Sequence, residues 1–267
     1  MQLYGLIGKT LGHSLSPRIH RRILEALGVA GDYALFEVAP QRLCALLPAL
    51  ETLSVRGANV TIPYKKDVIA LLSAISPQAQ AIGAVNTLYF EDGQWKGDNT
   101  DYFGLQRALA HHGIQLAGRR ATILGAGGAC EAVRALLADA GAREIVIVSR
   151  AAQKHGAHHG AQVVGYEALA TRTADLLINA TPVGMWPHVD ASPVQEAVIA
   201  RHGALVDLIY NPQQTLFMRM GMRMQKPVMN GLYMLVAQAV KAQEIWQGRP
   251  IDPAVTDAIY EELCQDV

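Results

Sequence analysis

Residues 121–130 read Ala-Thr-Ile-Leu-Gly-Ala-Gly-Gly-Ala-Cys, an apolar stretch that runs straight into a glycine-rich turn. The pattern predicts a strand over Ala121–Leu124 and a helix over Ala129–Ala140. Glycine allows a tight turn and lets backbone N–H groups approach a pyrophosphate, which the N-terminus of the helix also attracts. A glycine run alone is weak evidence, and a plain turn is the alternative, but the order strand, turn, helix predicts a Rossmann-type dinucleotide-binding domain. The residues expected at the dinucleotide are Gly125, Ala126, Gly127, Gly128 and Ala129.

A second strand, predicted over Glu144–Ser149, ends beside the basic residue Arg150. Enzymes that select NAD commonly carry Asp or Glu here, about 20 residues after the glycine turn, to bind the ribose 2′-hydroxyl. This chain has no acidic residue there, whereas Arg150 and Lys154 could pair with a 2′-phosphate. We therefore expect NADP, contacted by Ser149, Arg150 and Lys154. NAD is the alternative cofactor, and a solvated basic loop is the structural alternative.

Strand-like and helix-like segments alternate along the chain, which indicates an α/β fold with parallel sheets covered by helices. The dipeptide Asp92-Gly93 adds one hairpin. We expect two domains, a substrate-binding catalytic domain over residues 1–100 plus 236–267 and a Rossmann domain over residues 101–235. Further strands are predicted over Tyr4–Ile7, Leu35–Val38, Ala58–Thr61, Val85–Phe90, Gln94–Lys96, Leu176–Asn179, Leu205–Leu208 and Pro227–Met229. Further helices are predicted over Ser16–Leu27, Pro40–Leu53, Lys66–Ser73, Asp101–His112, Leu232–Gln247 and Pro253–Gln265.

The composition argues against several classes of protein. The 267 residues are 51% hydrophobic, and 23 basic and 23 acidic residues leave no net charge, which argues against nucleic acid or a membrane surface as partner. The apolar stretches are too short to span a bilayer, and the amino terminus lacks the pattern of a signal peptide. Cys44, Cys130 and Cys264 suggest neither disulfides nor a zinc site, and His155–His159 is interpreted as a solvated loop. We expect a cytoplasmic protein that acts on small molecules.

Three polar clusters of the first domain lie at or just after the ends of predicted strands, and a fourth lies at the domain junction. The carboxyl ends of such strands form the binding crevices of α/β sheets. The clusters offer hydroxyls, amides, one ammonium and one carboxylate, which suits a polyhydroxylated substrate with a carboxylate. Taken singly they have ordinary explanations, since Ser16 and Asp101 could cap helices and Asn86 could complete a turn. The clusters are Gly12–Pro17, Asn59–Lys65, Gly83–Thr87 and Asn99–Asp101.

In combination, these clusters resemble the shikimate dehydrogenase family over essentially the whole chain. They match the substrate-domain motifs of that family in order, as Gly-His-Ser-Leu-Ser-Pro, Asn-Val-Thr-Ile-Pro-Tyr-Lys, Gly-Ala-Val-Asn-Thr and Asn-Thr-Asp. The cofactor-domain motifs match at Gly125–Ala129, Asn179–Met185, Asp207–Tyr210 and Asn230–Leu232. So many matches in the same order make the resemblance specific.

The resemblance implies reversible, NADP-dependent reduction of 3-dehydroshikimate to shikimate, a step of aromatic amino acid biosynthesis by the shikimate pathway, without a metal. It also implies that Lys65 and Asp101 form the catalytic pair. Hydride transfer to a carbonyl builds negative charge on oxygen, which a nearby ammonium can stabilise and protonate. The implied substrate contacts are Ser14, Ser16 and Tyr210 at the carboxylate and Thr61, Asn86 and Gln238 at the ring. The cofactor motifs add Thr181, Leu208 and Gly231.

A few positions depart from the family pattern. Tyr102 and Tyr233 stand where the family has glycine, and Ser149–Ala151 reads Ser-Arg-Ala in place of Asn-Arg-Thr. These differences leave a paralogue open, and a quinate/shikimate dehydrogenase that uses NAD or both cofactors is the nearest alternative. Two further alternatives are a non-catalytic dinucleotide-binding regulator and a methylenetetrahydrofolate dehydrogenase. Intact Lys65 and Asp101 argue against the regulator. We expect a monomer or a homodimer.

Overall fold

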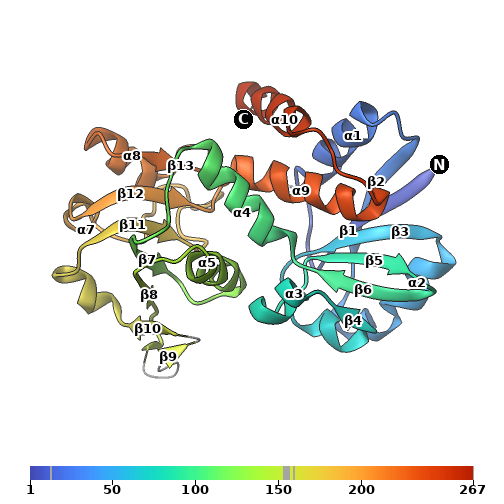
Figure 1. Ribbon diagram of the computed structural model, residues 1–267, viewed down its shortest axis with the longest axis horizontal. Coiled ribbons are helices and arrows are strands. Elements are labelled where there is room, and N and C mark those ends of the chain that lie inside the picture. Colours follow the sequence, from blue (N-terminus) through green and yellow to red (C-terminus); the bar gives the residue numbers. More distant parts are fainter. Residues whose placement is uncertain (13, 153–156, 159, 267) are drawn as a thin grey trace. The chain divides into compact units, whose positions relative to one another are not determined.

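The computed structural model describes residues 1–12, 14–152, 157–158 and 160–266 and has a mixed α/β architecture with two separate sheets (Figure 1). The chain forms two compact units. Unit 1 comprises Met1–Gly104 and Val236–Gln265, and unit 2 is formed mainly by Leu105–Leu235. The predicted α/β fold class is confirmed. The boundaries of the units fall within two helices, α4 (Thr100–His111) and α9 (Leu232–Gln247).

Unit 1 contains a six-stranded sheet with the strand order β2-β1-β3-β5-β6-β4. Strands β1, β2 and β3 are parallel, but β5 runs antiparallel to β3 and forms a hairpin with β6. The hairpin turn at Asp92 and Gly93 has φ values of 53° and 75°, as a type I′ turn requires. The expectation of a parallel sheet is confirmed for β1 with β2 and β3 and for β4 with β6, and it is wrong for β5, which pairs antiparallel with both β3 and β6. A two-residue turn can join only antiparallel strands, as the predicted hairpin requires. The strands are β1 (Gln2–Gly8), β2 (Gly31–Glu37), β3 (Val55–Val60), β4 (Ala74–Ile75), β5 (Thr87–Glu91) and β6 (Gln94–Asp98).

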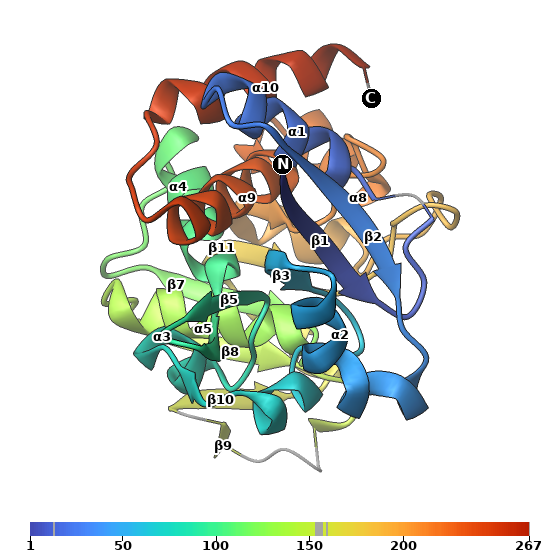
Figure 2. The same ribbon diagram turned by 90° about the vertical axis from the view of Figure 1, so that its right-hand side faces the viewer.

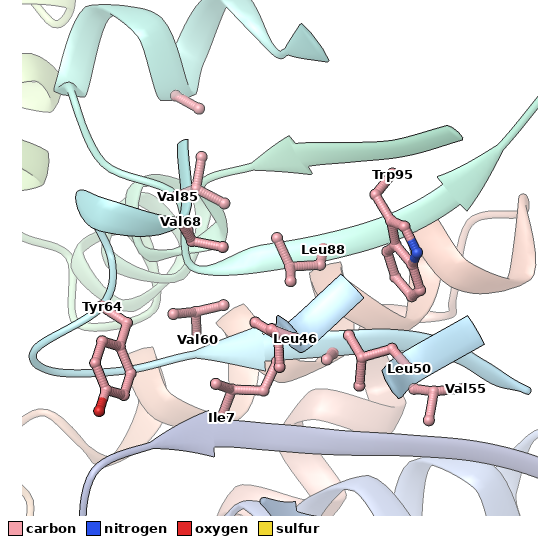
Figure 3. Close-up of a cluster of buried hydrophobic side chains, with 12 residues drawn as sticks. Ile7, Leu46, Leu50, Val55, Val60, Tyr64, Val68, Val85, Leu88 and Trp95 are labelled. Atoms are coloured by element: carbon pink, nitrogen blue, oxygen red, sulfur yellow. The ribbon is translucent and has the colours of Figure 1, made fainter. Parts of the chain in front are cut away.

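Helices cover both faces of the unit 1 sheet. On one face, Tyr33 of β2 packs in a cluster with Leu24 of α1 and Trp246 of α9, and α1 lies alongside β1 and β2 (Figure 2). On the other face, Ile7 and Leu88 pack with residues of α2 and α3 (Figure 3). Because successive side chains of a strand point to opposite faces, both faces of the central strands are apolar. The remaining elements are α1 (Ser16–Ala26), η1 (Pro40–Ala45), α2 (Leu46–Thr52), η2 (Asp67–Leu71), α3 (Pro77–Ile82) and α10 (Pro253–Asp266).

Unit 2 contains a seven-stranded sheet with the strand order β13-β12-β11-β7-β8-β10-β9. All described strand pairs are parallel except that of β9 with β10. Since β8 lies on one side of β7 and β11 on the other, the strand order reverses at β7, and such a switch point forms a ligand crevice at the carboxyl ends of the strands. The strands are β7 (Arg120–Leu124), β8 (Glu144–Val148), β9 (Ala157–His158), β10 (Ala161–Val164), β11 (Ala174–Asn179), β12 (His202–Asp207) and β13 (Val228–Met229). The helices are α5 (Gly128–Asp139), η3 (Tyr166–Ala170), α7 (Glu196–Ala200) and α8 (Leu216–Arg223).

Some elements differ from those predicted. The single helix expected over Pro40–Leu53 is a 3₁₀ turn followed by α2, because Pro48 has no N–H to bond the carbonyl one turn earlier. The helix expected over Lys66–Ser73 shortens to η2. The sequence pattern does not predict α3, which is too short for a helical period and begins at a cap formed by the hydroxyl of Ser76.

In the described part of the chain, no helix has both the length and the apolar composition that a membrane span requires.

Candidate active site

Two charged side chains meet at the carboxyl edge of the unit 1 sheet. Nζ of Lys65 lies 2.7 Å from Oδ2 of Asp101, and the two side chains are 24% and 16% exposed. The lysine follows β3, and the aspartate lies in the first turn of α4. A pair at this distance forms a charge-assisted hydrogen bond, and its partial exposure leaves both groups accessible to a ligand.

Local packing fixes the backbone that carries Lys65. The preceding residue, Tyr64, is buried in the core of unit 1, and its hydroxyl donates to the carbonyl oxygen of Val38. The carbonyl oxygen of Lys65 accepts a hydrogen bond from Val85 N at 2.7 Å. The backbone on both sides of Lys65 is thus anchored, and the lysine side chain extends from it to Asp101.

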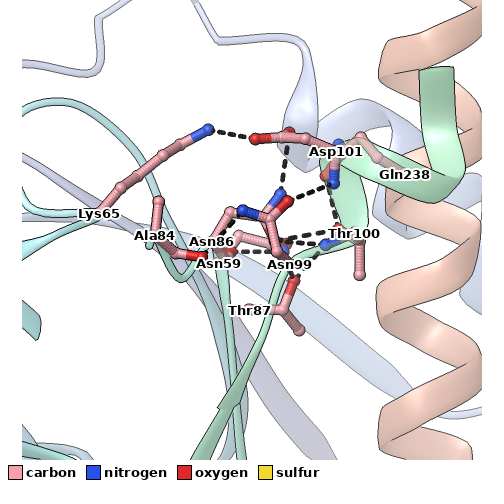
Figure 4. A network of polar contacts seen from close by, with 9 residues as sticks. All are labelled: Asn59, Lys65, Ala84, Asn86, Thr87, Asn99, Thr100, Asp101 and Gln238. Carbon is pink, nitrogen blue, oxygen red and sulfur yellow. Dashed lines mark hydrogen bonds and ion pairs between the residues drawn. The ribbon is translucent and has the colours of Figure 1, made fainter. Parts of the chain in front are cut away.

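Asp101 does not cap α4, contrary to the ordinary explanation for an aspartate at this position. Asn99 provides the cap, since its Oδ1 accepts from Asp101 N at 3.1 Å while its Nδ2 donates to Ala84 O at 2.9 Å. The carboxylate of Asp101 instead accepts from Lys65 through Oδ2 and from Nδ2 of Asn86 through Oδ1, at 2.9 Å (Figure 4). Both oxygens have a fixed partner, so the orientation of the carboxylate is defined.

Asn86 connects the ion pair to a buried polar network. Its side chain is 3% exposed, and its Oδ1 accepts a hydrogen bond from Thr100 N at 2.7 Å. The hydroxyl of Thr100 donates to Oε1 of Gln238 on α9 at 3.3 Å. One network therefore brings together four of the predicted site residues, namely Lys65, Asp101, Asn86 and Gln238 (Figure 4).

Three further residues of the network, Asn59, Thr87 and Thr100, had no role assigned from the sequence. Nδ2 of Asn59 donates to Oγ1 of Thr87 at 3.1 Å, and Oγ1 of Thr87 donates to Oδ1 of Asn86 at 2.9 Å. All three are buried. A polar residue between the apolar neighbours of a buried strand is the signal that could have identified Asn59, because a buried amide must find hydrogen-bond partners.

Thr61 and two serines lie at the ends of β3 and β1, which are neighbouring parallel strands. Thr61 N donates to Ile7 O at 2.8 Å, and Ser16 N donates to Oγ of Ser14 at 3.2 Å. The ordinary explanation of Ser16 as a helix cap does not hold, since Leu15 occupies the cap position and Ser16 is the first helical residue. The helix begins at Ser16 as predicted, with Pro17 as its second residue, a position in the first turn where proline is tolerated.

The glycine turn of unit 2 has the geometry that anion binding requires. Gly125 adopts a φ of 100°, and a Cβ at this residue would lie 2.8 Å from Cγ2 of Thr181. Gly127 caps α5, and at Gly127 and Gly128 no atom lies within 4 Å of such a Cβ. Residues 126–129 are exposed. The N-terminus of α5 therefore opens onto free space at the switch point of the sheet, where a pyrophosphate can reach backbone N–H groups.

The other predicted cofactor residues of unit 2 also follow strands of its sheet. Oγ1 of Thr181, after β11, donates to Oδ1 of Asn179 at 2.7 Å. Gly231 lies so close to the end of β12 that a Cβ would be 2.1 Å from Leu208 O. Tyr210 lies two residues after Leu208, and burial raises the pKa of its phenol. Because β7, β11 and β12 are adjacent and parallel, Thr181 and Leu208 stand at the same edge as the glycine turn.

The end of β8 carries the basic residue predicted to select NADP. Ser149 is buried, and its Oγ accepts from Ala151 N at 3.1 Å. Arg150 is exposed, and no carboxylate within the described ranges pairs with it. Its guanidinium is thus available to an anion. Lys154 and His155 lie outside the described residues.

Both tyrosines that depart from the family pattern are buried. Tyr233 is 6% exposed and stacks on His111 with ring centroids 4.1 Å apart. Tyr102 is 7% exposed and meets Phe103 edge to face at 5.6 Å. Each phenol ring that stands in place of glycine is therefore accommodated by packing against a neighbouring ring.

No group of three His, Cys, Asp or Glu side chains that could hold a metal ion occurs among the residues that the structure describes. None of the three cysteines forms a disulfide, and Cys44 and Cys264 are exposed whereas Cys130 is buried after the glycine turn. Burial raises the pKa of the Cys130 thiol to about 12, so this side chain packs as a small apolar group.

We compared the sequence with a protein-family model and with known relatives. The family model of the shikimate dehydrogenase substrate binding domain matches residues 6–88. A shikimate dehydrogenase (NADP(+)) from Clostridium beijerinckii is 44% identical over 262 residues, which cover 97% of each chain. One from Methanothermobacter thermautotrophicus is 41% identical, with 98% of this chain and 97% of the relative covered.

Solved structures give the same result. Shikimate dehydrogenase 1 from Peptoclostridium difficile superposes with a TM-score of 0.92 at 42% identity, over 100% of this chain and 99% of that one. The shikimate 5-dehydrogenase from Thermus thermophilus, solved with NADP(H) and shikimate, has a TM-score of 0.88 at 35% identity, with coverages of 98% and 99%. Because sequence identity and fold agree over nearly the whole of both chains, the chain belongs to the shikimate dehydrogenase family.

Proposed function

We propose that this chain catalyses the reversible, NADP-dependent reduction of 3-dehydroshikimate to shikimate. The observation that carries the proposal is the ion pair of Lys65 and Asp101, 2.7 Å apart and surrounded by amide and hydroxyl groups. Relatives named shikimate dehydrogenase (NADP(+)) support the choice of substrate and cofactor. The Thermus thermophilus relative was solved with both NADP(H) and shikimate, which adds support for the binding of both molecules.

We propose unit 1 as the substrate-binding domain, because it contains the ion pair and most of the polar groups suited to a hydroxylated ring. The serines after β1 offer two neighbouring hydroxyls for a carboxylate. The amides and hydroxyls around Asp101 offer donors and acceptors for ring hydroxyls. The proposed contacts are Ser14, Ser16 and Tyr210 at the carboxylate and Thr61, Asn86 and Gln238 at the ring.

Lys65 is the proton donor in the direction of reduction. Its ammonium donates a hydrogen bond to the substrate carbonyl oxygen and stabilises the negative charge that develops there. It then gives a proton to that oxygen, and Asp101 returns a proton from solvent to the lysine. In the direction of oxidation, the same pair removes the proton of the substrate hydroxyl. Asn86 holds one carboxylate oxygen of Asp101, so that the other stays on Lys65.

We propose unit 2 as the NADP-binding domain. NADPH, when bound, supplies the hydride for the reduction. The residues present fit this group, because the space in front of Gly127 and Gly128 is open and α5 begins there. The exposed guanidinium of Arg150 can pair bidentately with a 2′-phosphate. The proposed contacts are Gly125, Ala126, Gly127, Gly128, Ala129, Ser149, Arg150, Lys154, Thr181, Leu208 and Gly231.

Steady-state oxidation of shikimate and of quinate, each with NADP⁺ and with NAD⁺, tests the proposal. We expect the highest kcat/KM for shikimate with NADP⁺. Turnover of quinate with NAD⁺ but not of shikimate with NADP⁺ would show a quinate dehydrogenase instead. Tight cofactor binding without turnover of any pair would indicate a dinucleotide-binding regulator.

We further infer that the reaction takes place in the cytoplasm and that the enzyme is a monomer or a homodimer. Cys44 is exposed and forms no disulfide, and a reducing compartment preserves such a thiol. Sedimentation equilibrium of the purified protein checks the oligomeric state, and a tetramer or larger assembly would contradict the inference.

A further inference from the structure

A chain of buried hydrogen bonds extends from Asp101 into the core of unit 1. Its first three links join Asp101 Oδ1 to Asn86 Nδ2 at 2.9 Å, Asn86 Oδ1 to Thr87 Oγ1 at 2.9 Å, and Thr87 Oγ1 to Asn59 Nδ2 at 3.1 Å (Figure 4). In the fourth link, Oδ1 of Asn59 accepts from the hydroxyl of Tyr33 at 2.8 Å. Tyr33 lies on β2 and Asn59 on β3, so the tyrosine side chain reaches across β1, which separates them in the sheet.

The order of donors and acceptors along this chain leaves one orientation for each amide. An ionised carboxylate can only accept, so the Asn86 amide must present its nitrogen to Asp101 and its oxygen to Thr87. The hydroxyl of Thr87 gives its proton to that oxygen and accepts from the nitrogen of Asn59. The oxygen of Asn59 then faces Tyr33, whose proton completes the chain. Nδ2 of Asn59 also donates to the backbone carbonyl oxygen of Asn86 at 3.2 Å, so Thr87 and Asn86 hold the nitrogen side of this amide and Tyr33 holds its oxygen side.

Tyr33 is buried and packs against a second aromatic ring. It is 2% exposed, and its ring stacks on His20 with centroids 4.0 Å apart and planes inclined by 6°. Nδ1 of His20 lies 3.1 Å from Nε2 of Gln243 on α9. Burial raises the pKa of the Tyr33 phenol and lowers the pKa of His20 to about 3. The phenol thus keeps its proton near neutral pH, and the stacked imidazole remains uncharged.

We propose that Tyr33 is a positioning residue, whose hydroxyl acts through this chain of hydrogen bonds to hold Asp101 with Oδ2 toward Lys65. The inference rests on the dehydrogenase activity proposed above. Without the phenol, Oδ1 of Asn59 loses a buried hydrogen-bond donor, so the Asn59 amide is held on its nitrogen side alone and shifts relative to Thr87 and to the backbone of Asn86, which carries the amide that orients the carboxylate. A misplacement of about 1 Å caused far from the reacting atoms can cost about 10²-fold in rate.

The first test compares Tyr33→Phe with Tyr4→Phe. Tyr4 is a matched control, because it is 1% exposed, belongs to the same hydrophobic cluster and pairs with Tyr33 in the β1–β2 register. Its hydroxyl contacts Gln2 and Gln247 rather than the chain. We expect Tyr33→Phe to lower kcat about 10-fold with KM for shikimate within about twofold, while Tyr4→Phe keeps the wild-type kcat. Equal kcat values for the two variants would overturn the proposal.

A double-mutant cycle separates positioning from a general loss of stability. In an Asn86→Ala background the chain is already broken, so adding Tyr33→Phe should cause no further loss of kcat. A full additional 10-fold loss in that background would show that Tyr33 acts by another route. If Tyr33→Phe does not fold, Thr87→Val and Thr87→Ser replace it, since valine removes the middle link and serine keeps the hydroxyl. We expect the serine variant to retain kcat and the valine variant to lose it about 10-fold.

A readout independent of turnover keeps this inference distinct from the proposed function. The side-chain amide protons of Asn86, assigned from their absence in Asn86→Ala, report the bond to Asp101 in NMR spectra. We expect their hydrogen exchange to accelerate at least about 10-fold in Tyr33→Phe and to remain unchanged in Tyr4→Phe, whether or not shikimate is oxidised. Unchanged exchange in Tyr33→Phe would overturn the positioning role, and absence of wild-type turnover would overturn only the function.

Discussion

The ammonium of Lys65 reaches Asp101 from a turn whose backbone is anchored by Tyr64 and Val85, so removing the side chain should leave that turn intact. We expect Lys65→Ala to lower kcat by about 10²–10⁴-fold, the usual effect of losing a general acid–base group, with little change in KM. Lys66→Ala, which removes the adjacent exposed lysine, is the control and should keep the wild-type kcat. Near-normal turnover of Lys65→Ala in a steady-state assay would exclude the proton-donor role.

Arg150 is the residue on which cofactor selection depends in this proposal. A guanidinium bound to a phosphate contributes about 1.5–3 kcal/mol, so Arg150→Ala should raise KM for NADP⁺ by about 10–100-fold and leave KM for NAD⁺ nearly unchanged. Arg143→Ala provides the control, because Arg143 is exposed just before the amino end of β8, at the opposite edge of the sheet. An equal rise in KM for both cofactors would show that Arg150 supports the fold of the loop rather than the 2′-phosphate.

Within the strand–turn–helix element of unit 2, two glycines serve different purposes. Gly125 has a φ of 100°, and a methyl group there would meet Thr181, so Gly125→Ala should lower the free energy of unfolding by about 1–3 kcal/mol. Gly127 has φ −89° and ψ −172°, which any residue adopts, and the space around its Cα is open. Gly127→Ala should therefore keep wild-type stability.

The second half of this prediction concerns the cofactor. The methyl group of Gly127→Ala would occupy the space in which a pyrophosphate approaches the backbone, so Kd for NADP⁺ should rise at least about 10-fold. Urea unfolding and fluorescence titration of the two variants separate the two effects. Wild-type NADP⁺ affinity in Gly127→Ala would show that the cofactor does not bind at this turn.

The carboxyl end of β12 depends on Asp207, which is fully buried and ties together three segments. Its Oδ1 accepts from Asn179 Nδ2 and Ile209 N, and its Oδ2 accepts from Thr215 Oγ1 at 2.6 Å. Burial raises the pKa of Asp207 to about 6, from an ordinary value of 3.8. Between these values the folded state retains a proton that the unfolded state has lost. The contribution of Asp207 to stability is therefore fully present below about pH 4 and is lost as the pH rises through 6.

Asp207→Asn should remove this pH dependence, because an amide keeps the size and polarity of the protonated acid and does not ionise. Relative to wild type, the free energy of unfolding of the variant should increase by up to about 3 kcal/mol between pH 4 and pH 7. Urea unfolding of both proteins at several pH values measures the difference. Asp190→Asn, which changes an exposed aspartate of unit 2, should show no such trend. A difference for Asp207→Asn that does not vary with pH would contradict the prediction.

Over the whole molecule, the sequence predicts those strands and helices that carry a local pattern of apolar residues. The central strands β1, β3, β7 and β11 are confirmed because each carries an apolar run that is buried on both faces. The six residues of α3 and the two of β4 are too short to show a period, and tertiary contacts stabilise them. The hairpin is the exception among short features, because Asp92-Gly93 is a strong local signal.

Among the residues of the candidate site, too, some have a local sequence signal and others do not. Lys65 and Asp101 carry no local signal that separates them from a surface lysine or a helix cap, and only the family resemblance singled them out. The amide of Asn59 stands between Ala58 and Val60 in a buried strand, which is a readable signal. Tyr33 has none, since its contact with Asn59 exists only because β2 and β3 flank β1 in the sheet. Strand order is set by the packing of the entire unit, so no local pattern can report it.

The proposal that unit 1 binds shikimate and unit 2 binds NADP can be tested on the intact protein by hydrogen–deuterium exchange. The network around Asp101 belongs to unit 1, and the glycine turn belongs to unit 2. Shikimate alone should slow exchange over residues 59–65 and 84–101, and NADP⁺ alone should slow it over residues 121–130 and 179–185, because a bound ligand suppresses local opening. Gly127→Ala should lose the protection by NADP⁺ and keep the protection by shikimate. Protection of residues 121–130 by shikimate, with residues 59–65 unaffected, would reverse the assignment of the two units.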